Sequence, residues 1–346
     1  EILSGLVGSE MCIRDRYITD KITETMKKLF ISVWALAALA SCSKEENMGS
    51  GTGDVRVAIV PSAGIEHNVI SRAAVEGTSF AEGADVFRLS AFESAAEPTD
   101  WTAAGAEAFE NMQVNCAANG SLSLATPKYY PPTGTNAPKL WFYAYAPSEN
   151  GSYTNGNGTA KPSVAYTITG QEDIMAGKVT NTNGFGGVAN GETQTHPAFE
   201  FSHLLKKITF KVKAGATFDA GSNTAVSQIV VKNVKTSASL NVVNGTLEFS
   251  GDADQSLTLS GNSTTITAAG ASVPGCLMFE PGTSFTVSVT AGGVTYADAT
   301  VTLTGTDAGK AGVSHEVTLT FHRSGIVPTA TITDWVKGDD AGVDIQ

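Results

Sequence analysis

The chain has 346 residues, with 34 acidic against 22 basic side chains and a formal net charge of −12 at pH 7. A chain of this length is typical of about two domains and can bury sizeable hydrophobic cores. Nucleic-acid binding draws mainly on clustered Lys and Arg side chains that neutralise phosphates, so this acidic balance argues against nucleic acid as a partner.

The first clear feature of the sequence is an apolar run behind a positively charged start. A Met-Lys-Lys start precedes the run Leu29–Ala40, in which Ser32 is the polar exception. The run is too short to span a bilayer, which takes about 20 residues, and its length is typical of a secretion signal. The sequence therefore predicts an exported chain whose signal peptide covers residues 26–41.

A cysteine follows this run directly. Cys42 comes after the small residues Ala40 and Ser41, and this ending resembles a bacterial lipobox, in which the cysteine receives diacylglycerol and becomes the first mature residue. Each buried CH₂ of an acyl chain contributes roughly 0.8 kcal/mol, so several chains anchor a protein firmly. We therefore expect lipidation at Cys42. The next residues, Ser43–Glu46, resemble the acidic tag of surface-exposed lipoproteins in Bacteroides-type bacteria, a pattern that a solvated linker would share.

The residues before and after the signal are interpreted separately. Residues 1–25 lie upstream of a complete signal, and the stretch Ser4–Arg16 resembles translated sequencing-adapter read-through. We therefore expect residues 1–25 not to belong to the natural protein. Residues 42–53 end in a Gly- and Ser-rich stretch, which predicts a flexible tether between the lipid and the first strand.

The remaining chain alternates apolar and polar residues with a period of two. The alternation is strict in residues 207–213, 284–290 and 317–321, which is typical of strands with one face on a core and the other in water. Asn244-Gly245 lies between two such runs and predicts a hairpin with a type I′ turn. Many short strands with Gly-rich turns predict an all-β fold made of antiparallel β-sandwiches.

The strand pattern also predicts the domain organisation. The first strand is expected at Asp54–Val60, with alternate apolar side chains on one face, namely Val55, Val57 and Ile59. A long, poorly patterned part follows, and the alternation restarts around Phe199–Val212. We therefore expect an N-terminal domain at 54–205 and a C-terminal domain at 206–346.

No motif of catalysis, cofactor binding or metal binding is found in the sequence, so we expect no enzyme activity, no cofactor and no metal. The five histidines are scattered, and His203 is interpreted as a structural histidine with its polar groups satisfied. Two cysteines beyond the lipobox are predicted to be buried free thiols, Cys116 and Cys276. One strand carries three aromatic side chains on one face, which favours a core but would also suit a sugar-stacking platform: Trp141, Tyr143 and Tyr145.

Several segments, in order, resemble one family. They are Tyr129–Ser148 with its aromatic strand, Glu172–Gly177, Phe199–Val212 with its F-x-F-x-H pattern, and His315–Gly338 with its I-x-x-W-x-x-G ending. Together with the lipobox, these segments are similar to Bacteroides-type fimbrillins, the lipoprotein precursors of type V pili. The resemblance implies two tandem transthyretin-like antiparallel β-sandwich domains behind a lipoprotein signal peptide, without enzymatic activity.

The resemblance also implies an assembly route. The precursor is lipidated and carried to the outer-membrane surface, where an arginine-directed protease cuts after the first strand and releases both lipid and strand. The emptied groove then accepts a strand from another pilin subunit. Arg72 is the expected cleavage site and is favoured over Arg88, because the small residues Ala73 and Ala74 follow it. The implied partners are thus other pilin subunits, the protease, and outer-membrane lipid through Cys42 before processing.

The expected donor is the C-terminal segment 331–346, in whole or in part, whose large apolar residues are Ile332, Trp335, Val336, Val343 and Ile345. The sequence thus predicts a structural subunit, stalk or tip, that passes from the outer membrane to the fimbrium. The alternative is a permanently anchored surface lipoprotein that binds a glycan or a host protein. Cleavage at Arg72 with polymer formation would favour the first function, and an intact lipoprotein with exposed aromatic side chains the second.

Overall fold

The protein is described by a computed structural model that covers residues 56–65, 79–134, 136–180, 183–218, 224–323 and 325–333. These residues form twenty β-strands. Nowhere among them is there a helix of the length and apolarity needed to cross a membrane. The all-β fold predicted from the period-two alternation is therefore confirmed.

Strands that precede residue 205 build the first sheet, and strands from both sides of that residue build the second. The seven-stranded sheet has the order β1 (Ser62–Ile65), β9 (Ala198–His203), β8 (Met175–Val179), β5 (Lys139–Ala146), β2 (Gly83–Ser94), β3 (Phe109–Cys116) and β4 (Leu122–Leu124). The four-stranded sheet beside it has the order β13 (Thr246–Ser250), β12 (Ser237–Asn241), β7 (Ser163–Thr167) and β6 (Gly151–Thr154).

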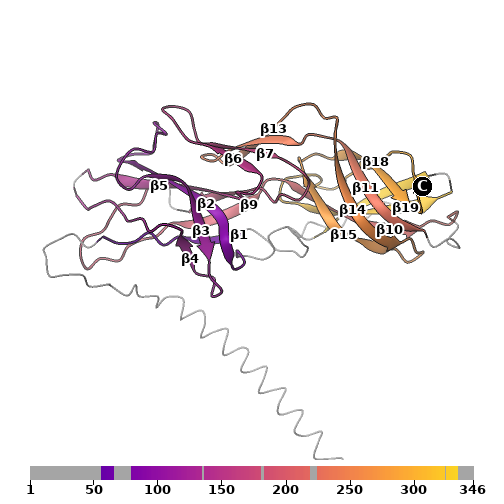
Figure 1. Ribbon diagram of the computed structural model, residues 1–346, viewed down its shortest axis with the longest axis horizontal. Helices are drawn as coiled ribbons and strands as arrows, with labels where there is room; N and C mark the ends of the chain where they lie inside the picture. The colour runs from indigo at the N-terminus through magenta and orange to yellow at the C-terminus, as the bar shows by residue number, and fades with distance from the viewer. Residues whose placement is uncertain are drawn as a thin grey trace, which may run out of the picture. The chain divides into compact units, whose positions relative to one another are not determined.

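Later strands build the other two sheets (Figure 1). One has the order β15 (Ala271–Phe279), β10 (Lys206–Ala214), β19 (Ser314–His322) and β20 (Gly325–Thr333). The other has the order β14 (Gln255–Thr265), β11 (Ala225–Val234), β16 (Ser284–Ala291) and β17 (Val294–Thr295), with β18 (Ala299–Thr302) also on β16. Neighbouring strands are antiparallel except in the pairs β1–β9 and β10–β19, which are parallel.

The alternation seen in the sequence becomes the inward face of these last two sheets. In β10 the apolar side chains Ile208, Phe210 and Val212 are buried, while Thr209 and Lys211 between them are only partly buried. The same alternation holds in β19 for Val317, Leu319 and Phe321. These side chains meet those of β11 and β16 in one continuous core, so the two sheets form a β-sandwich.

The seven-stranded sheet has a core on each face, because successive side chains of a strand point to opposite sides. Phe142 and Ala144 of β5 join the core that also contains Phe87 and Phe201. Tyr145 of the same strand joins a second core, together with side chains of β7 and β12. Buried side chains therefore pack on both faces of this sheet.

The hairpin expected at Asn244-Gly245 is present, but its turn differs from the prediction. β12 and β13 pair from Asn241 to Thr246, so four residues form the loop, and of the two expected turn residues only Gly245 has a positive φ, 69°. The Oδ1 of Asn241 accepts hydrogen bonds from the backbone N–H groups of Val243 and Asn244. This local side-chain capping stabilises the longer loop in place of a type I′ turn.

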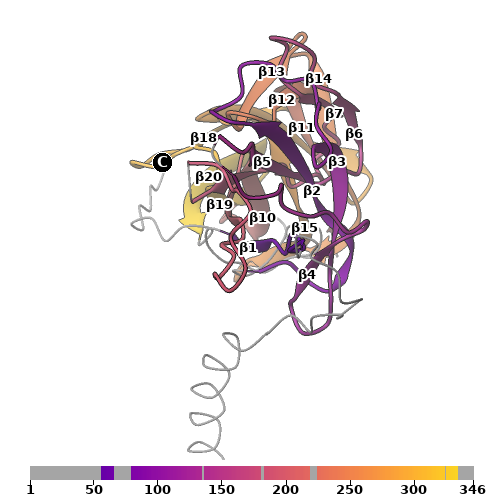
Figure 2. The same ribbon diagram turned by 90° about the vertical axis from the view of Figure 1, so that its left-hand side faces the viewer.

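The same hairpin links the two sides of the expected domain boundary. β12 pairs with β7 over its whole length, from Ser237 opposite Thr167 to Asn241 opposite Ser163. The orange β13 therefore lies with the magenta strands β6 and β7 in both views (Figures 1 and 2). A domain boundary near residue 205 stays a prediction, with the hairpin as a segment that would cross it.

Candidate functional site

The N-terminal segment, defined here as residues 56–65, differs from the strand expected at Asp54–Val60. Among residues 56–60 only Ala58 takes part in a β-bridge, with Tyr129. The regular strand is β1, which begins at Ser62. Pro61 lies between the two, and a proline has no backbone N–H to donate to a ladder. The expected strand is therefore divided into a bridge and a later, shorter strand.

Backbone hydrogen bonds attach this segment at two places. The Ile59 N–H donates to the Lys128 carbonyl at 2.8 Å, and the Tyr130 N–H donates to the Val57 carbonyl at 3.1 Å. β1 then runs parallel to β9, from Ser62 opposite Ala198 to Ile65 opposite Phe201. Since β1 is the outermost strand of its sheet, it covers an edge that β9 would otherwise present.

Buried isoleucines attach the segment to the core below it. Ile59 and Ile65 are each only 4% exposed, and they belong to a core that contains Phe80, Phe199 and Phe201. Fully burying an isoleucine contributes roughly 1.5–3 kcal/mol, an upper figure because the unfolded chain already buries part of this area. Val60, in contrast, is 50% exposed.

Polar contacts fix the start and the middle of the segment. Arg56 forms an ion pair with the buried Glu107, and its guanidinium lies 5.5 Å from the centre of the Tyr129 ring. The Val60 N–H donates to Nδ1 of His196 at 3.3 Å. Burial lowers the pKa of His196 and so favours the neutral ring, in which Nδ1 accepts this hydrogen bond.

Several sequence-predicted site residues lie outside the described part of the chain: Cys42, Val55, Arg72, Trp335, Val336, Val343 and Ile345. Val57 and Ile59 lie inside it, with Val57 partly buried and Ile59 buried against the same core. Arg88, the second candidate for cleavage, lies in β2, where its backbone is paired with β3 on one side and β5 on the other.

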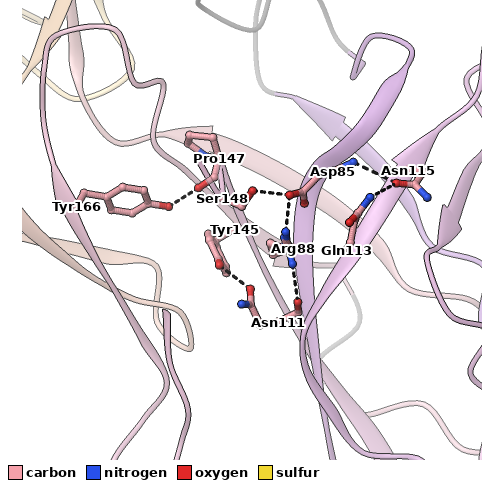
Figure 3. A network of polar contacts seen from close by, with 9 residues as sticks. All are labelled: Asp85, Arg88, Asn111, Gln113, Asn115, Tyr145, Pro147, Ser148 and Tyr166. Atoms are coloured by element: carbon pink, nitrogen blue, oxygen red, sulfur yellow. Dashed lines mark hydrogen bonds and ion pairs between the residues drawn. The ribbon is translucent and has the colours of Figure 1, made fainter. Parts of the chain in front are cut away.

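Arg88 is also held by its side chain, as Figure 3 shows. It pairs with the carboxylate of Asp85 and donates to the Asn111 carbonyl at 3.1 Å. Asp85 in turn accepts a hydrogen bond from the Ser148 hydroxyl at 2.6 Å. Asp85 and Asn111 both have positive φ, 58° and 53°, next to the irregular register of β2 and β3. This network therefore holds a bulged part of the sheet.

The expected donor segment 331–346 begins within an existing strand. β20 is the outermost strand of its sheet, and it places Thr331 opposite Glu316 and Ile332 opposite His315. Ile326 and Ala330 of the same strand pack against the core of the sandwich. Residues 331–333 therefore already have a partner strand within their own chain.

The segment Glu172–Gly177 contributes two buried carboxylates. Glu172 accepts hydrogen bonds from the backbone N–H of Thr169 at 2.7 Å and of Gly170 at 3.1 Å. Asp173 lies 2.7 Å from Nδ1 of His203, the histidine of the F-x-F-x-H pattern. His203 is thus a buried histidine with a structural partner, and this pair joins residues 169–173 to the end of β9.

The three aromatic side chains expected on one face of β5 have different surroundings. Tyr145 is 2% exposed, its ring is stacked on that of Tyr153, and its hydroxyl donates to Asn111 at 2.7 Å. It is a core residue, as favoured from the sequence. Trp141 and Tyr143 are only partly buried.

The predicted free thiols are confirmed, since Cys116 and Cys276 are both buried and unbridged. Within the described ranges, His, Cys, Asp and Glu side chains form no group of three or more that could hold a metal ion. The candidate functional site is the N-terminal segment together with the edge of β9 to which it is paired. Sequence reasoning missed Ile65 and His196 in this site, although the F-x-F pattern of β9 indicated the core beneath.

Comparisons with known proteins show the family of the chain and agree with its fold. The fimbrillin-like family profile matches residues 71–335. A candidate cell adhesion protein of Bacteroides uniformis has a similar fold, with a TM-score of 0.54 and 19% identity, over 83% of this chain and 100% of that one. A fimbrial protein of Bacteroides vulgatus gives 0.52 and 16%, over 80% and 100%. No curated protein matches the sequence.

Proposed function

Because the chain belongs to the fimbrillin-like family, a family of cell-surface adhesion proteins rather than enzymes, we propose that it is a structural subunit, stalk or tip, of a type V pilus. The family supports a role in pili or adhesion at the cell surface. The proposal adds the route: removal of the N-terminal segment by proteolysis, followed by entry of a strand from another subunit.

One observation carries this proposal: the N-terminal segment adds β1 to the edge of a sheet and buries Ile59 and Ile65 in the core beside it. Among the described strands, β1 pairs with β9 alone, so its departure leaves the other strands of the sheet paired. It would uncover the backbone of β9 and the core around Phe199 and Phe201, from which Ile59 and Ile65 withdraw. An unpaired strand edge beside empty apolar pockets is the arrangement that strand addition requires.

The cleavage site proposed is Arg72. It follows the N-terminal segment in the sequence and precedes Phe80, so a cut there would release Ile59 and Ile65 and leave Phe80 in the core. Arg88 is a poor substrate by comparison, because proteases bind an extended chain and its backbone is paired on both sides. Arg323 lies in an exposed turn after β19. A cut there would release only the C-terminal end of the chain and leave the N-terminal segment in place.

The donor proposed is the segment 331–346 of another subunit. Residues 331–333 are paired with β19, so the part that can enter a neighbouring groove without breaking this ladder begins after Thr333. Of the apolar residues expected to serve as the donor, Trp335, Val336, Val343 and Ile345 belong to that part. Ile332 would have to leave β20 first.

Before processing, a lipid on Cys42 would hold the subunit at the outer-membrane surface. The function as a subunit is tested by N-terminal sequencing of the protein shed from its native cell. A chain that begins at Ala73 supports a polymerising subunit. A chain that carries only a blocked, lipidated Cys42 contradicts it and favours the alternative, a permanently anchored adhesin.

A further inference from the structure

A cavity of about 530 Å³ lies beside the strand that carries the partly buried aromatics. It is lined by residues of the neighbouring strands β5 and β8, by Leu204 after β9 and by the β12–β13 loop at Val242–Gly245. That loop comes close to the sheet, since a Cβ on Gly245 would lie 3.1 Å from that of Ala176. The volume falls within the range of small-molecule sites, about 300–1,000 Å³.

Two aromatic side chains form one wall of the cavity. Trp141 and Tyr143 are two residues apart on β5, so they share a face of the sheet. The indole N–H of Trp141 donates to the Ser94 carbonyl at 3.2 Å, and the backbone of Gly184 lies so close to the indole that a Cβ there would come within 2.9 Å. The indole is therefore held in one orientation without filling the cavity.

Tyr143 is held in a similar way. Its ring meets those of Phe92 and Trp101 edge-on, with centroids 6.0 and 5.5 Å away. Burial raises the pKa of Tyr143 to about 12, and the negative charge of Glu97 adds to the rise. The hydroxyl thus keeps its proton and can donate a hydrogen bond at neutral pH.

Polar residues that line the cavity supply both hydrogen-bond donors and hydrogen-bond acceptors. Glu97 and Lys178 are exposed charged residues that line it, together with Asn244. A carboxylate only accepts hydrogen bonds, an ammonium only donates them, and an amide does both. One negative and one positive group leave the lining without net charge, so it has no preference for an ionic ligand.

We propose that this cavity binds a neutral saccharide. A sugar ring has an apolar face of C–H groups that suits a fixed aromatic side chain such as Trp141, and an edge of hydroxyls that suits Glu97, Lys178 and Asn244. Trp141 and Tyr143 point to the face of β5 opposite to that of Phe142, which belongs to the core that holds Ile59 and also borders the cavity. Saccharide binding at this cavity requires no cleavage, so it can be measured on the unprocessed chain.

The test measures binding by the unprocessed full chain of neutral oligosaccharides that end in galactose, mannose or N-acetylglucosamine, and of their sialylated counterparts. The expected result is saturable binding of a neutral oligosaccharide, weakened about tenfold or more by Trp141→Ala and by Glu97→Gln. Val294→Ala is the control, because Val294 is an exposed apolar residue outside the cavity, and it should leave the affinity unchanged.

Glu97 and Lys178 are exposed, so Glu97→Gln and Lys178→Gln should leave the fold intact. If the Trp141→Ala variant does not fold, these two variants alone test saccharide binding. The proposal is overturned if no neutral oligosaccharide binds saturably, if only sialylated ones bind, or if these variants bind as well as the unaltered chain. It is also overturned if the same variants abolish self-association instead, which would assign the cavity to a protein contact. Failure here leaves the pilus function standing, since no cleavage is involved.

Discussion

Ile65 lies directly opposite Phe201 in the parallel ladder between β1 and β9. Both side chains are buried in one core, and the Phe201 ring meets the Phe80 ring edge-on, with centroids 5.0 Å apart. The last residue of β1 is therefore joined to the sheet by backbone pairing and to the core by packing. Release of the segment has to break both interactions.

The first prediction concerns how firmly the segment is held. Ile59→Ala should destabilise its attachment by about 2–5 kcal/mol, because the change leaves a cavity beside the buried aromatic rings. The neighbouring Val60→Ala is the matched control, since Val60 is 50% exposed and should change stability by at most about 0.5 kcal/mol. Amide hydrogen exchange of Ser62–Ile65 should be at least about tenfold faster in the first variant only. Equal exchange in both variants would mean that Ile59 does not retain the segment.

A second prediction concerns the pair Asp173–His203. Asp173→Ala removes the 2.7 Å contact to the buried imidazole and should cost about 1–3 kcal/mol of unfolding free energy, measured in urea. Asp307→Ala is the control, because Asp307 pairs with Lys310 near the surface and such pairs contribute about 1 kcal/mol or less. If both variants lose the same unfolding free energy, the buried Asp173–His203 pair contributes no more to stability than a surface pair.

The third prediction is a dependence on pH through His315, which is 1% exposed and accepts a hydrogen bond from the Gly309 N–H at 3.1 Å. Burial, and then the positive charge of Lys206, lower the pKa of His315 to about 4. Between pH 6.5 and 4 the unfolded chain binds a proton that the folded chain does not, so stability falls as the pH falls through this window.

The variant His315→Gln should remove this part of the acid sensitivity. The loss of unfolding free energy between pH 7 and pH 4.5 should shrink by on the order of 2 kcal/mol, measured by urea denaturation at each pH. His322→Gln, at the partly exposed end of the same strand, serves as the control and should keep the pH dependence of the unaltered chain. An unchanged slope in the His315 variant would refute the assignment.

The fourth prediction concerns the anchor. Cys42→Ala should abolish incorporation of labelled fatty acid, because the thiol is the group that a lipobox modifies, and the protein should then remain in the periplasm. Cys116→Ala is the control, since Cys116 is a buried thiol in β3, and acylation should persist in it. Continued labelling of the Cys42 variant would show that the lipobox interpretation is wrong.

The alternation of apolar and polar residues was enough to predict those strands that have one buried face and one more exposed face. Phe210 and Val212 alternate with polar residues, and they alternate in burial too. Pairing between distant segments leaves no such pattern. Neither the parallel ladder of β1 on β9 nor the pairing of β12 with β7 could be predicted, because each depends on residues far apart in the chain.

The sequence predicted only part of the candidate site, because the rest depends on contacts between segments far apart in the chain. Ile59 was expected to face a core and does so. The regular strand begins later than expected, at Ser62, and Pro61 before it has no backbone N–H for the ladder. His196 gave no signal, since its role depends on meeting the Val60 N–H from a remote segment. The buried Lys206 likewise resembled a surface lysine in the sequence, whereas its ammonium lies 4.4 Å from the Phe279 ring centre.

The most direct test of strand exchange is to cut the purified chain with an arginine-specific protease and follow oligomer mass by light scattering. The account predicts that cutting at Arg72 yields ladders of oligomers, with the N-terminal fragment leaving as they grow. A chain ending at Trp335 should accept a strand but donate none, and an Arg72→Gln chain should stay monomeric. Cut chains that remain monomeric while the fragment leaves, or ladders formed equally well by the truncated chain, would contradict it.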